Sequence, residues 1–454
     1  MIRPYIHSPF LVCEESIMSE KRSGLSRRAF LRRTAALAAV PCVVPSSVFG
    51  RNGAVPPSER IIVGGIGIRG RGMHDLRWML PEKDVQFVAI CDAQKRSREM
   101  VKKYVDERYG NSDCAMYPEI NEFLATRTDI DAVLVTTGDR WHTLAACLAM
   151  RAGKDVYSEK PSAMTMAEGQ AVEDTARRYR RIYQTGTQRL SEGNFTFANE
   201  LLRLGYLGDV HTVRAHIAPW DAAEMRHDWL EAEPLPGIDE VDWDAWVGPC
   251  PWRPYNSAYT RGGWRNHYDF HTSCIGEWGA HTFAQCQVAI GAGETSAIEY
   301  GYVANDSGDG MVTKFANGIK MVLERDMDKK IWHGSCGVRY EGTKGWVATA
   351  DGYAQPDMSN PAWMADFKKL VANYMARTQR PMSHMRNWLD CVKSRRQTVA
   401  NAVMMHHTMS TVHAANICMW LKRDVKFDPS TETFIGDAEA NRFRTRAMRE
   451  PWIY

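Results

Sequence analysis

Short apolar runs alternate with amphipathic stretches along the first half of the chain. The strand-like runs are Arg60 to Gly64, Val85 to Cys91, Ile130 to Thr136 and Asp155 to Ser158. An amphipathic stretch from Thr143 to Ala152 separates the last two, as a crossover helix would. Such alternation is typical of parallel strands joined by helices. We therefore expect an α/β domain with a parallel sheet over residues 58–185.

The second half of the chain has a different pattern. Strand-like segments recur with turn signals such as Asn317-Gly318, at Val210 to Ile217, Ala297 to Val303, Met311 to Phe315, Ile319 to Glu324 and Gly337 to Glu341. A long helical stretch, Met385 to Lys422, is broken near Arg395. We expect a second domain with its own sheet over residues 186–454, and expect the helical stretch 385–422 to pack back on the first domain. Open sheets usually hide one face, which predicts a homodimer or homotetramer formed by sheet stacking.

The loop after the first strand has the spacing of a dinucleotide-binding turn. Gly65, Gly67 and Gly70 fit the G-x-G-x-x-G pattern, with Ile68 and Arg69 between the last two glycines. The loop follows an apolar strand and opens a helical stretch. Glycines in that context let main-chain amides approach a pyrophosphate at the helix N-terminus. The context favours a dinucleotide site over a plain glycine-rich turn.

Asp92 directly follows the second strand, twenty-two residues after Gly70. A carboxylate there can accept both ribose hydroxyls of NAD and would repel the extra phosphate of NADP. Lys95 and Arg96 lie just beyond it and could hold a phosphate, so NADP stays possible. NAD is the expected cofactor.

The run Tyr157-Ser158-Glu159-Lys160-Pro161 carries a lysine on a predicted turn after the fourth strand. Open α/β sheets bind ligands at this end of their strands, so Lys160 should lie beside the dinucleotide. Oxidation of an alcohol by hydride transfer requires removal of the hydroxyl proton, and a nearby positive nicotinamide favours the neutral amine that could take it. Taken alone, the run is better explained as a surface turn.

Five motifs in order carry a family resemblance: the glycine loop, "AICD", "TTGDRWH", "AGKDVYSEKP" and "TGTQR". They resemble the glucose-fructose oxidoreductase, inositol dehydrogenase and MocA family, in its bacterial secreted branch. The later segments "VDWDAWVGPCPWRPYN", "GEWGAH", "RNWLDCVKS" and "REPWIY" are similar to that branch too. The resemblance covers Arg60 to Tyr454. It implies an N-terminal Rossmann domain plus a C-terminal α+β domain with an open, mostly antiparallel sheet whose face covers the nicotinamide.

The resemblance also implies where catalysis occurs. His281 ends the segment "GEWGAH" and is the implied proton donor and acceptor, together with Lys160. Glu277 lies four residues earlier on the same predicted helical face, where it could tune the imidazole. This chain departs from the family pattern twice, because Glu277 replaces the usual aspartate and Ala284 stands where a second aspartate is common. The hydroxyl that is oxidised, and whether net oxidation occurs, therefore stay open.

Together, these arguments assign the candidate site residues. The expected cofactor-binding residues are Gly65, Gly67, Ile68, Arg69, Gly70, Asp92, Thr137, Asp139, Trp141, His142, Glu159, Lys160 and Gln188. The expected substrate-binding residues are Lys160, Arg189, Trp264, Tyr268, Asp269, His271, Glu277 and His281. Trp141 and His142 are expected on a loop after the third strand, and the "RNHYDFHTS" residues as replacement contacts for the missing acid. The latter could equally form an ordinary surface loop.

The N-terminal segment, residues 1–53, has the composition of a signal and linker. Ser26-Arg27-Arg28-Ala29-Phe30-Leu31 fits the twin-arginine signature, and the apolar stretch Thr34 to Val44 is too short to span a bilayer in the mature protein. We expect export to the periplasm or outside the cell, with the cofactor loaded before export and tightly held. Met18 could be the true start. The alternative is a basic disordered tail.

Composition narrows the partners. With 57 basic and 54 acidic residues the charge is nearly balanced, which argues against nucleic-acid and membrane-surface partners. The eleven cysteines are scattered and form no CxxC pair, so neither a metal site nor a disulfide framework is expected.

The expected function is NAD(P)-dependent oxidation of a sugar, glycoside or cyclitol CH–OH, with a small-molecule carbohydrate as the substrate. A second hypothesis is a redox-neutral glycoside hydrolase or lyase, in which a transient 3-keto intermediate permits elimination of the aglycone. A third is a protein that binds NAD or sugar and has lost catalysis.

Overall fold

The computed structural model describes residues 55–217, 224–304, 309–323, 336–352 and 354–454. The predicted export signal lies outside the described residues. The compact unit that holds the two expected sheets begins at Ser58 and ends at Tyr454. Its architecture confirms the predicted fold class.

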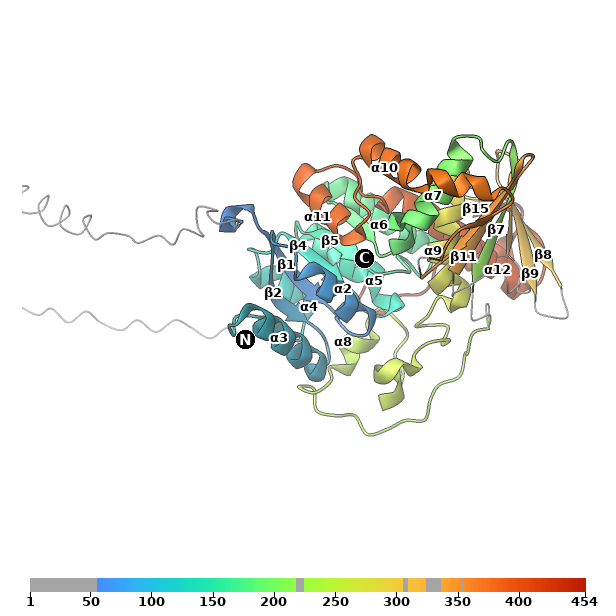
Figure 1. Cartoon of the computed structure of the whole chain (residues 1–454). Helices are drawn as coiled ribbons and strands as arrows, with labels where there is room; N and C mark the ends of the chain where they lie inside the picture. Colours follow the sequence, from blue (N-terminus) through green and yellow to red (C-terminus); the bar gives the residue numbers. More distant parts are fainter. Residues whose placement is uncertain (1–54, 218–223, 305–308, 324–335, 353) are drawn as a thin grey trace, which may run out of the picture. The chain divides into compact units, whose positions relative to one another are not determined.

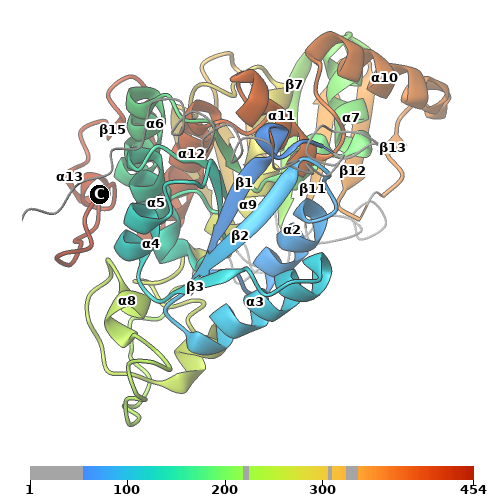
Figure 2. The same ribbon diagram turned by 90° about the vertical axis from the view of Figure 1, so that its left-hand side faces the viewer.

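The first sheet has six parallel strands in the order β3-β2-β1-β4-β5-β6. They are β1 (Ile61–Ile66), β2 (Val85–Cys91), β3 (Ala115–Tyr117), β4 (Ala132–Val135), β5 (Asp155–Ser158) and β6 (Tyr183–Thr185). The helices between them are α2 (Arg71–Met79), α3 (Lys95–Tyr109), α4 (Ile120–Thr126), α5 (Asp139–Arg151) and α6 (Met166–Tyr179). Figure 2 shows α4, α5 and α6 on one side of the sheet and α2 and α3 on the other. Each face has its own apolar core.

Two boundaries in this domain differ from the prediction. The first strand runs to Ile66 rather than Gly64, because Gly64 and Gly65 keep their pairing with both β2 and β4. The helix predicted from Thr143 begins at Asp139. An acidic side chain in the first helical turn favours this earlier start, since it faces the positive end of the helix dipole. Trp141 and His142 are therefore helical and do not lie on a loop.

The second sheet has nine strands in the order β13-β12-β11-β7-β10-β9-β8-β14-β15. They are β7 (Val210–Ile217), β8 (Glu299–Val303), β9 (Gly310–Lys314), β10 (Lys320–Leu323), β11 (Cys336–Gly342), β12 (Gly345–Ala350), β13 (Asp357–Met358), β14 (Val425–Asp428) and β15 (Thr433–Phe434). Strand β10 pairs with β7 in parallel, and the other pairs are antiparallel. The expected open, mostly antiparallel sheet is confirmed.

The second domain also contributes helices. They are α7 (Gly193–Arg203), α8 (Trp243–Val247), α9 (Ser273–Ala289), α10 (Phe367–Thr378), α11 (His384–Ser394), α12 (Ala402–Leu421) and α13 (Ala438–Arg442). Figure 1 shows α9 and α12 on the side of the larger sheet that faces the parallel sheet. Trp388 of α11 is fully buried in the apolar core that α2 shares with the parallel sheet, and α12 packs on α6. No helix in the described ranges is both long and apolar enough to cross a bilayer.

Candidate cofactor and substrate site

A cavity of about 540 Å³ opens at the carboxyl ends of the parallel strands. Its volume lies within the range of small-molecule sites, about 300–1,000 Å³. Of the expected site residues, those that line it are Gly67, Arg69, Gly70, Asp92, Thr137, Asp139, Trp141, His142, Glu159, Lys160, Gln188, Arg189, Trp264, Glu277 and His281. One continuous cavity therefore brings together residues from both domains.

The glycine loop is shaped by a close backbone approach. Gly67 has a φ of 71°, and a Cβ atom there would lie 2.4 Å from Cγ2 of Thr137. Gly70 also has a positive φ, of 45°, and α2 begins immediately after it. Only glycine adopts these conformations without strain. The positive end of the α2 dipole and the open backbone suit a pyrophosphate.

Gly65 and Ile68 have positions that differ from those expected from the G-x-G-x-x-G pattern. Gly65 lies inside β1, where a Cβ atom would come within 2.4 Å of Cδ1 of Ile68, and Ile68 is itself buried in the core. Gly65 and Ile68 thus pack beneath the loop and do not line the cavity. Gly72, which the pattern missed, makes the close helix-to-strand approach, because a Cβ there would lie 2.1 Å from Oγ1 of Thr136.

Asp92 lies at the end of β2, where the ribose was expected. Its Oδ1 accepts a hydrogen bond of 2.8 Å from the main-chain N–H of Gln94. Burial raises the pKa of Asp92 to about 6, although that hydrogen bond and the nearby arginines oppose the rise. The ammonium of Lys95 lies 2.9 Å from Glu240, so the cation expected to hold a phosphate is already paired.

The first turn of α5 joins the cavity wall to the second domain. Trp141 Nε1 donates to the carbonyl oxygen of Ala245 at 3.0 Å, and Nδ1 of His142 lies 2.7 Å from the carbonyl oxygen of Pro161. The Asp139 carboxylate accepts hydrogen bonds from the backbone and hydroxyl of Thr272. These side chains therefore brace the wall through protein contacts.

Two buried polar atoms of this wall have no hydrogen-bond partner among the described residues, Oγ1 of Thr137 and Nη1 of Arg140. Both residues line the cavity. Leaving a buried donor or acceptor unpaired costs about 1–3 kcal/mol, so such atoms are expected where a ligand binds. Together with the glycine loop, they show that the wall fits a polar ligand such as a dinucleotide.

Lys160 and Glu277 meet across the two domains. Nζ of Lys160 donates to Oε1 of Glu277 at 3.3 Å, and lies 4.7 Å above the ring of Trp278. Nε2 of His271 lies 3.1 Å from the second carboxylate oxygen of Glu277, and Arg265 lies 3.7 Å from it. Burial alone would raise the pKa of Glu277, but these partners lower it well below the usual range. Glu277 is therefore an ionised anchor for Lys160.

His281 has different partners from those expected. Its Nε2 lies 2.9 Å from Nη1 of Arg189, and its Nδ1 lies 3.0 Å from Oγ1 of Thr187. The predicted tuning of His281 by Glu277 is thus wrong in this arrangement, since Lys160 takes Glu277 and Arg189 takes His281. Burial, followed by the charges of Arg189 and Lys160, lowers the pKa of His281 well below its usual value.

Glu159 and Gln188 form a buried layer beside Lys160. Nε2 of Gln188 donates to Oε1 of Glu159 at 2.6 Å and to the hydroxyl of Tyr157 at 3.0 Å. Arg71, which the sequence analysis missed, lies 3.5 Å from Glu159. This layer fixes the backbone at the Lys160 turn, where the Lys160 N–H also donates to Glu159 at 3.2 Å.

The segment "RNHYDFHTS" divides into two groups. His271 reaches the cavity indirectly through Glu277, and Trp264, which directly precedes the segment, lines the cavity. Tyr268 packs on Trp420, and Asp269 pairs with the buried Arg253. Neither side chain lines the cavity, so the structure does not bring them together with the other expected substrate contacts. Both side chains are used to attach the segment to its surroundings.

Aromatic residues missed by the sequence analysis complete the wall. Trp246 and Tyr259 line the cavity, and they belong to an apolar cluster with Trp243 and Phe270. The guanidinium of Arg140 stacks 3.7 Å from the ring centroid of Trp246 and donates to its carbonyl oxygen. The closely spaced tryptophans of "VDWDAWVGPCPW" were the sequence feature that could have predicted an aromatic wall here.

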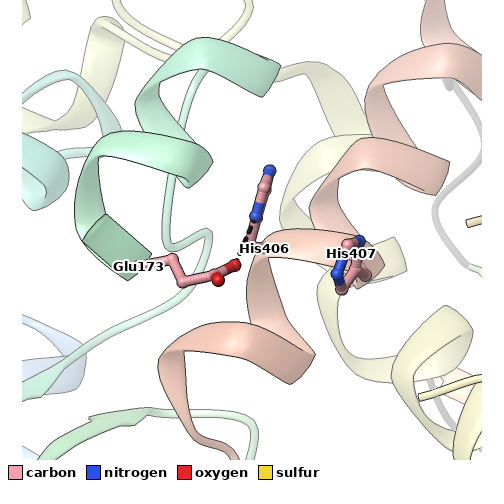
Figure 3. Close-up of side chains that lie close together, drawn as sticks. All are labelled: Glu173, His406 and His407. Atoms are coloured by element: carbon pink, nitrogen blue, oxygen red, sulfur yellow. Dashed lines mark hydrogen bonds and ion pairs between the residues drawn. The ribbon is translucent and has the colours of Figure 1, made fainter. Parts of the chain in front are cut away.

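In the part of the chain that the structure describes, Glu173, His406 and His407 are close enough to share a metal ion, with ligand atoms within 4.8 Å (Figure 3). The two imidazoles stack with centroids 5.0 Å apart and planes 17° apart. A metal ion must lie near the plane of each imidazole ring that binds it. Because the two rings are stacked and nearly parallel, no single point beside them lies in both planes. His406 instead bridges Glu173 at 2.7 Å and Glu432 at 2.9 Å, as an ion-paired clamp.

We expect His406→Asn to lower the free energy of unfolding by about 2 kcal/mol at pH 6, because two partly buried carboxylates lose a charged partner. Burial alone would lower the pKa of His406, but Glu173 and Glu432 raise it to about 9. The stabilisation is therefore complete below the unfolded value of 6.5 and is lost as the pH rises through about 9. Urea midpoints of both proteins at pH 6, 8 and 10 should converge, and a constant difference would contradict the ion-paired clamp.

Comparison with known proteins adds two family matches. The model described as "Oxidoreductase family, NAD-binding Rossmann fold" matches residues 60–187, and "Oxidoreductase family, C-terminal alpha/beta domain" matches residues 204–454. Among solved structures, the WlbA dehydrogenase from Bordetella pertussis in complex with NADH and UDP-GlcNAcA is 13% identical, with a TM-score of 0.59 over 82% of this chain and 98% of that one. This likeness shows the fold.

Curated relatives that match this chain are named as glycoside hydrolases and not as dehydrogenases. The α-N-acetylgalactosaminidase of Shewanella oneidensis is 26% identical over 235 residues, which is 45% of this chain and 49% of that protein. A glycosyl hydrolase family 109 protein of Saccharopolyspora erythraea is 32% identical over 180 residues, 36% of this chain and 39% of the relative. The chain thus spans less than half the length of these curated relatives.

Proposed function

This chain belongs to the glucose-fructose oxidoreductase, inositol dehydrogenase and MocA family, and from that premise we propose that it oxidises a carbohydrate CH–OH group by hydride transfer to bound NAD. The observation that carries the proposal is the position of Lys160. Its ammonium meets Glu277 inside the same cavity that the glycine loop and Asp92 line. A proton-transfer group and a dinucleotide wall thus share one enclosed space.

The residues of the first domain fit the cofactor. Gly67 and the start of α2 would hold the pyrophosphate, and Asp92 would accept the ribose hydroxyls. Thr137 and Arg140 offer the unpartnered polar atoms. Bound NAD would supply the hydride acceptor, which no side chain can provide. The preference for NAD over NADP rests on Asp92 and on the pairing of Lys95 with Glu240.

Lys160 would remove the hydroxyl proton as the carbon loses its hydride. Glu277 orients the amine, and His271 and Arg265 hold Glu277 in place. Trp264 and Trp278 line the cavity beside this group and offer apolar rings on which a sugar face can stack. The substrate would therefore bind between Lys160 and the second domain.

Incubation of the purified protein with free sugars and cyclitols, without added cofactor, tests this function. Native mass spectrometry should first detect NAD retained by the protein. A substrate should then convert the bound cofactor to its reduced form stoichiometrically, seen by absorbance. A protein that neither retains nor binds NAD would contradict the proposal.

A second candidate is a redox-neutral glycosidase, and the names of the curated relatives favour it. Oxidation at C3 would acidify the C2 proton, and loss of that proton would expel the aglycone from C1. Water would then add across the resulting C1–C2 double bond, and the hydride would return to C3. Nitrophenyl glycosides distinguish the two, since release of nitrophenol with the bound cofactor unchanged supports the cycle. Ala284, where the family commonly has an acid, is consistent with chemistry that differs from simple oxidation.

The proposal includes twin-arginine export to the periplasm or beyond, supported by Ser26-Arg27-Arg28-Ala29-Phe30-Leu31. That route carries folded proteins, so NAD could be loaded before export. Fractionation of cells that express Arg27→Lys, Arg28→Lys double variants should show retention in the cytoplasm.

A further inference from the structure

Arg189 reaches the imidazole of His281 from the turn that directly follows the first domain. It leaves the first domain on the short turn Gln188–Ser191 after β6. Nη1 lies 2.9 Å from Nε2 of His281, and Nη2 lies 2.8 Å from the carboxylate of Asp351, just after β12. The side chains of Arg189 and Asp351 are each 14% exposed. The guanidinium is therefore fixed at both ends.

The hydrogen bonds define the tautomer of His281. A guanidinium only donates, so Nε2 of His281 must accept and cannot carry a proton. In the neutral ring the proton then lies on Nδ1, which faces Oγ1 of Thr187 at 3.0 Å. The Thr187 hydroxyl can in turn donate to the carbonyl oxygen of Ala280 at 3.3 Å. This chain of contacts satisfies one tautomer only.

We propose that Arg189 is a positioning residue that holds His281 neutral and protonated on Nδ1, and so assigns the substrate's hydroxyl proton to Lys160. This inference rests on the proposed hydride transfer. In that step Lys160, as the base, would take the O–H proton while the C–H hydride leaves for bound NAD and the carbonyl forms. The lone pair on Nε2 of His281 accepts the hydrogen bond from Arg189 and does not take the proton. His281 then contributes only shape and polarity to the site.

The charges around His281 support this assignment. The cations that face it come from several elements: Arg189, Lys160 after β5, and Arg71 of α2. His384 of α11 also faces it, while Glu277 on its own helix is paired with Lys160 and Asp351 with Arg189. These cations would repel a positive charge on the imidazole, which favours the neutral ring.

Histidine-selective ¹⁵N NMR of the holoenzyme tests the inference without turnover. In the wild type, the ring signals of His281, assigned with His281→Gln, should show a proton on Nδ1 throughout pH 5 to 9. In Arg189→Ala the protonation midpoint should move upward, and Arg189→Lys should restore most of the wild-type behaviour. Arg386→Ala, which breaks another interdomain pair with Asp84, should leave His281 unchanged.

A proton on Nε2 in the wild type, or an unchanged midpoint in Arg189→Ala, would overturn the inference. Once a substrate is known, Arg189→Ala should lose about 10-fold in rate at pH 6 and stay within about twofold at pH 9, relative to the wild type. Equal losses at both pH values would also contradict it. Failure to find any substrate would instead count against the proposed function, because the NMR result does not depend on it.

Discussion

Replacing Lys160 with alanine should reduce single-turnover reduction of the bound cofactor by about 10³-fold, a loss of roughly 4 kcal/mol in transition-state stabilisation. The reason is geometric. Lys160 is the basic side chain that reaches the space between the dinucleotide wall and Glu277, whereas Nε2 of His281 is covered by Arg189. Stopped-flow absorbance of the reduced nicotinamide measures this step directly.

The same variant should bind NAD within about threefold of the wild type, since the glycine loop and Asp92 are untouched. Its melting temperature should change by a few degrees at most, because Glu277 keeps His271 and Arg265 as partners. Lys393→Ala is the matched control, as Lys393 pairs with Asp84 away from the cavity. A Lys160→Ala protein within tenfold of wild-type activity would exclude Lys160 as the base.

The fold could be predicted because its signals are repeated along the chain. Apolar runs such as Val85–Cys91 are strands that neighbours cover on both faces, so their periodicity survives any detail of packing. Boundaries were less predictable, because they depend on tertiary contacts. Gly64 and Gly65 have weak strand propensity, yet pairing with β2 and β4 keeps them in β1.

The cofactor side of the site was more predictable than the substrate side. Gly67, Asp92 and Lys160 lie at strand ends, and a parallel sheet brings its strand ends together whatever surrounds it. His281, Glu277 and Arg189 depend on how two domains meet. The i, i+4 spacing correctly put Glu277 and His281 on one helix, but spacing does not reveal that Lys160 and Arg189 would each take one of them.

Tyr268 and Asp269 also show that the substrate side of the site depends on contacts that the sequence pattern does not reveal. Their polar, aromatic character suited a sugar site, and their neighbours Trp264 and His271 do lie at or beside the cavity. Asp269 instead forms an ion pair with Arg253, a buried arginine whose position cannot be predicted from a local sequence pattern. A buried charge must be paired, and the fold decides which acid supplies the pair.

Asp92→Asn should weaken NAD binding about 100-fold at pH 8. A carboxylate that accepts two ribose hydroxyls makes two charge-assisted hydrogen bonds, each worth about 1.5–3 kcal/mol, and the amide oxygen replaces them poorly. The loss should be smaller for NADP, whose phosphate the carboxylate repels. Asp129→Asn, at the opposite end of the strands and paired with Arg127, is the matched control and should bind both cofactors as the wild type does.

The pH dependence of binding separates this role from a packing role. The pKa of Asp92 is raised to about 6 in the unliganded protein, and the ribose hydroxyls require the ionised form. Affinity for NAD should therefore be highest above pH 6 and fall about tenfold per pH unit below it, because the carboxyl must then lose a proton to bind. Calorimetric titration of cofactor-stripped protein at pH 5, 6 and 8 measures this slope. Asp92→Asn should show no such slope, and a wild type with equal affinity at pH 5 and 8 would mean that Asp92 does not contact the ribose as a carboxylate.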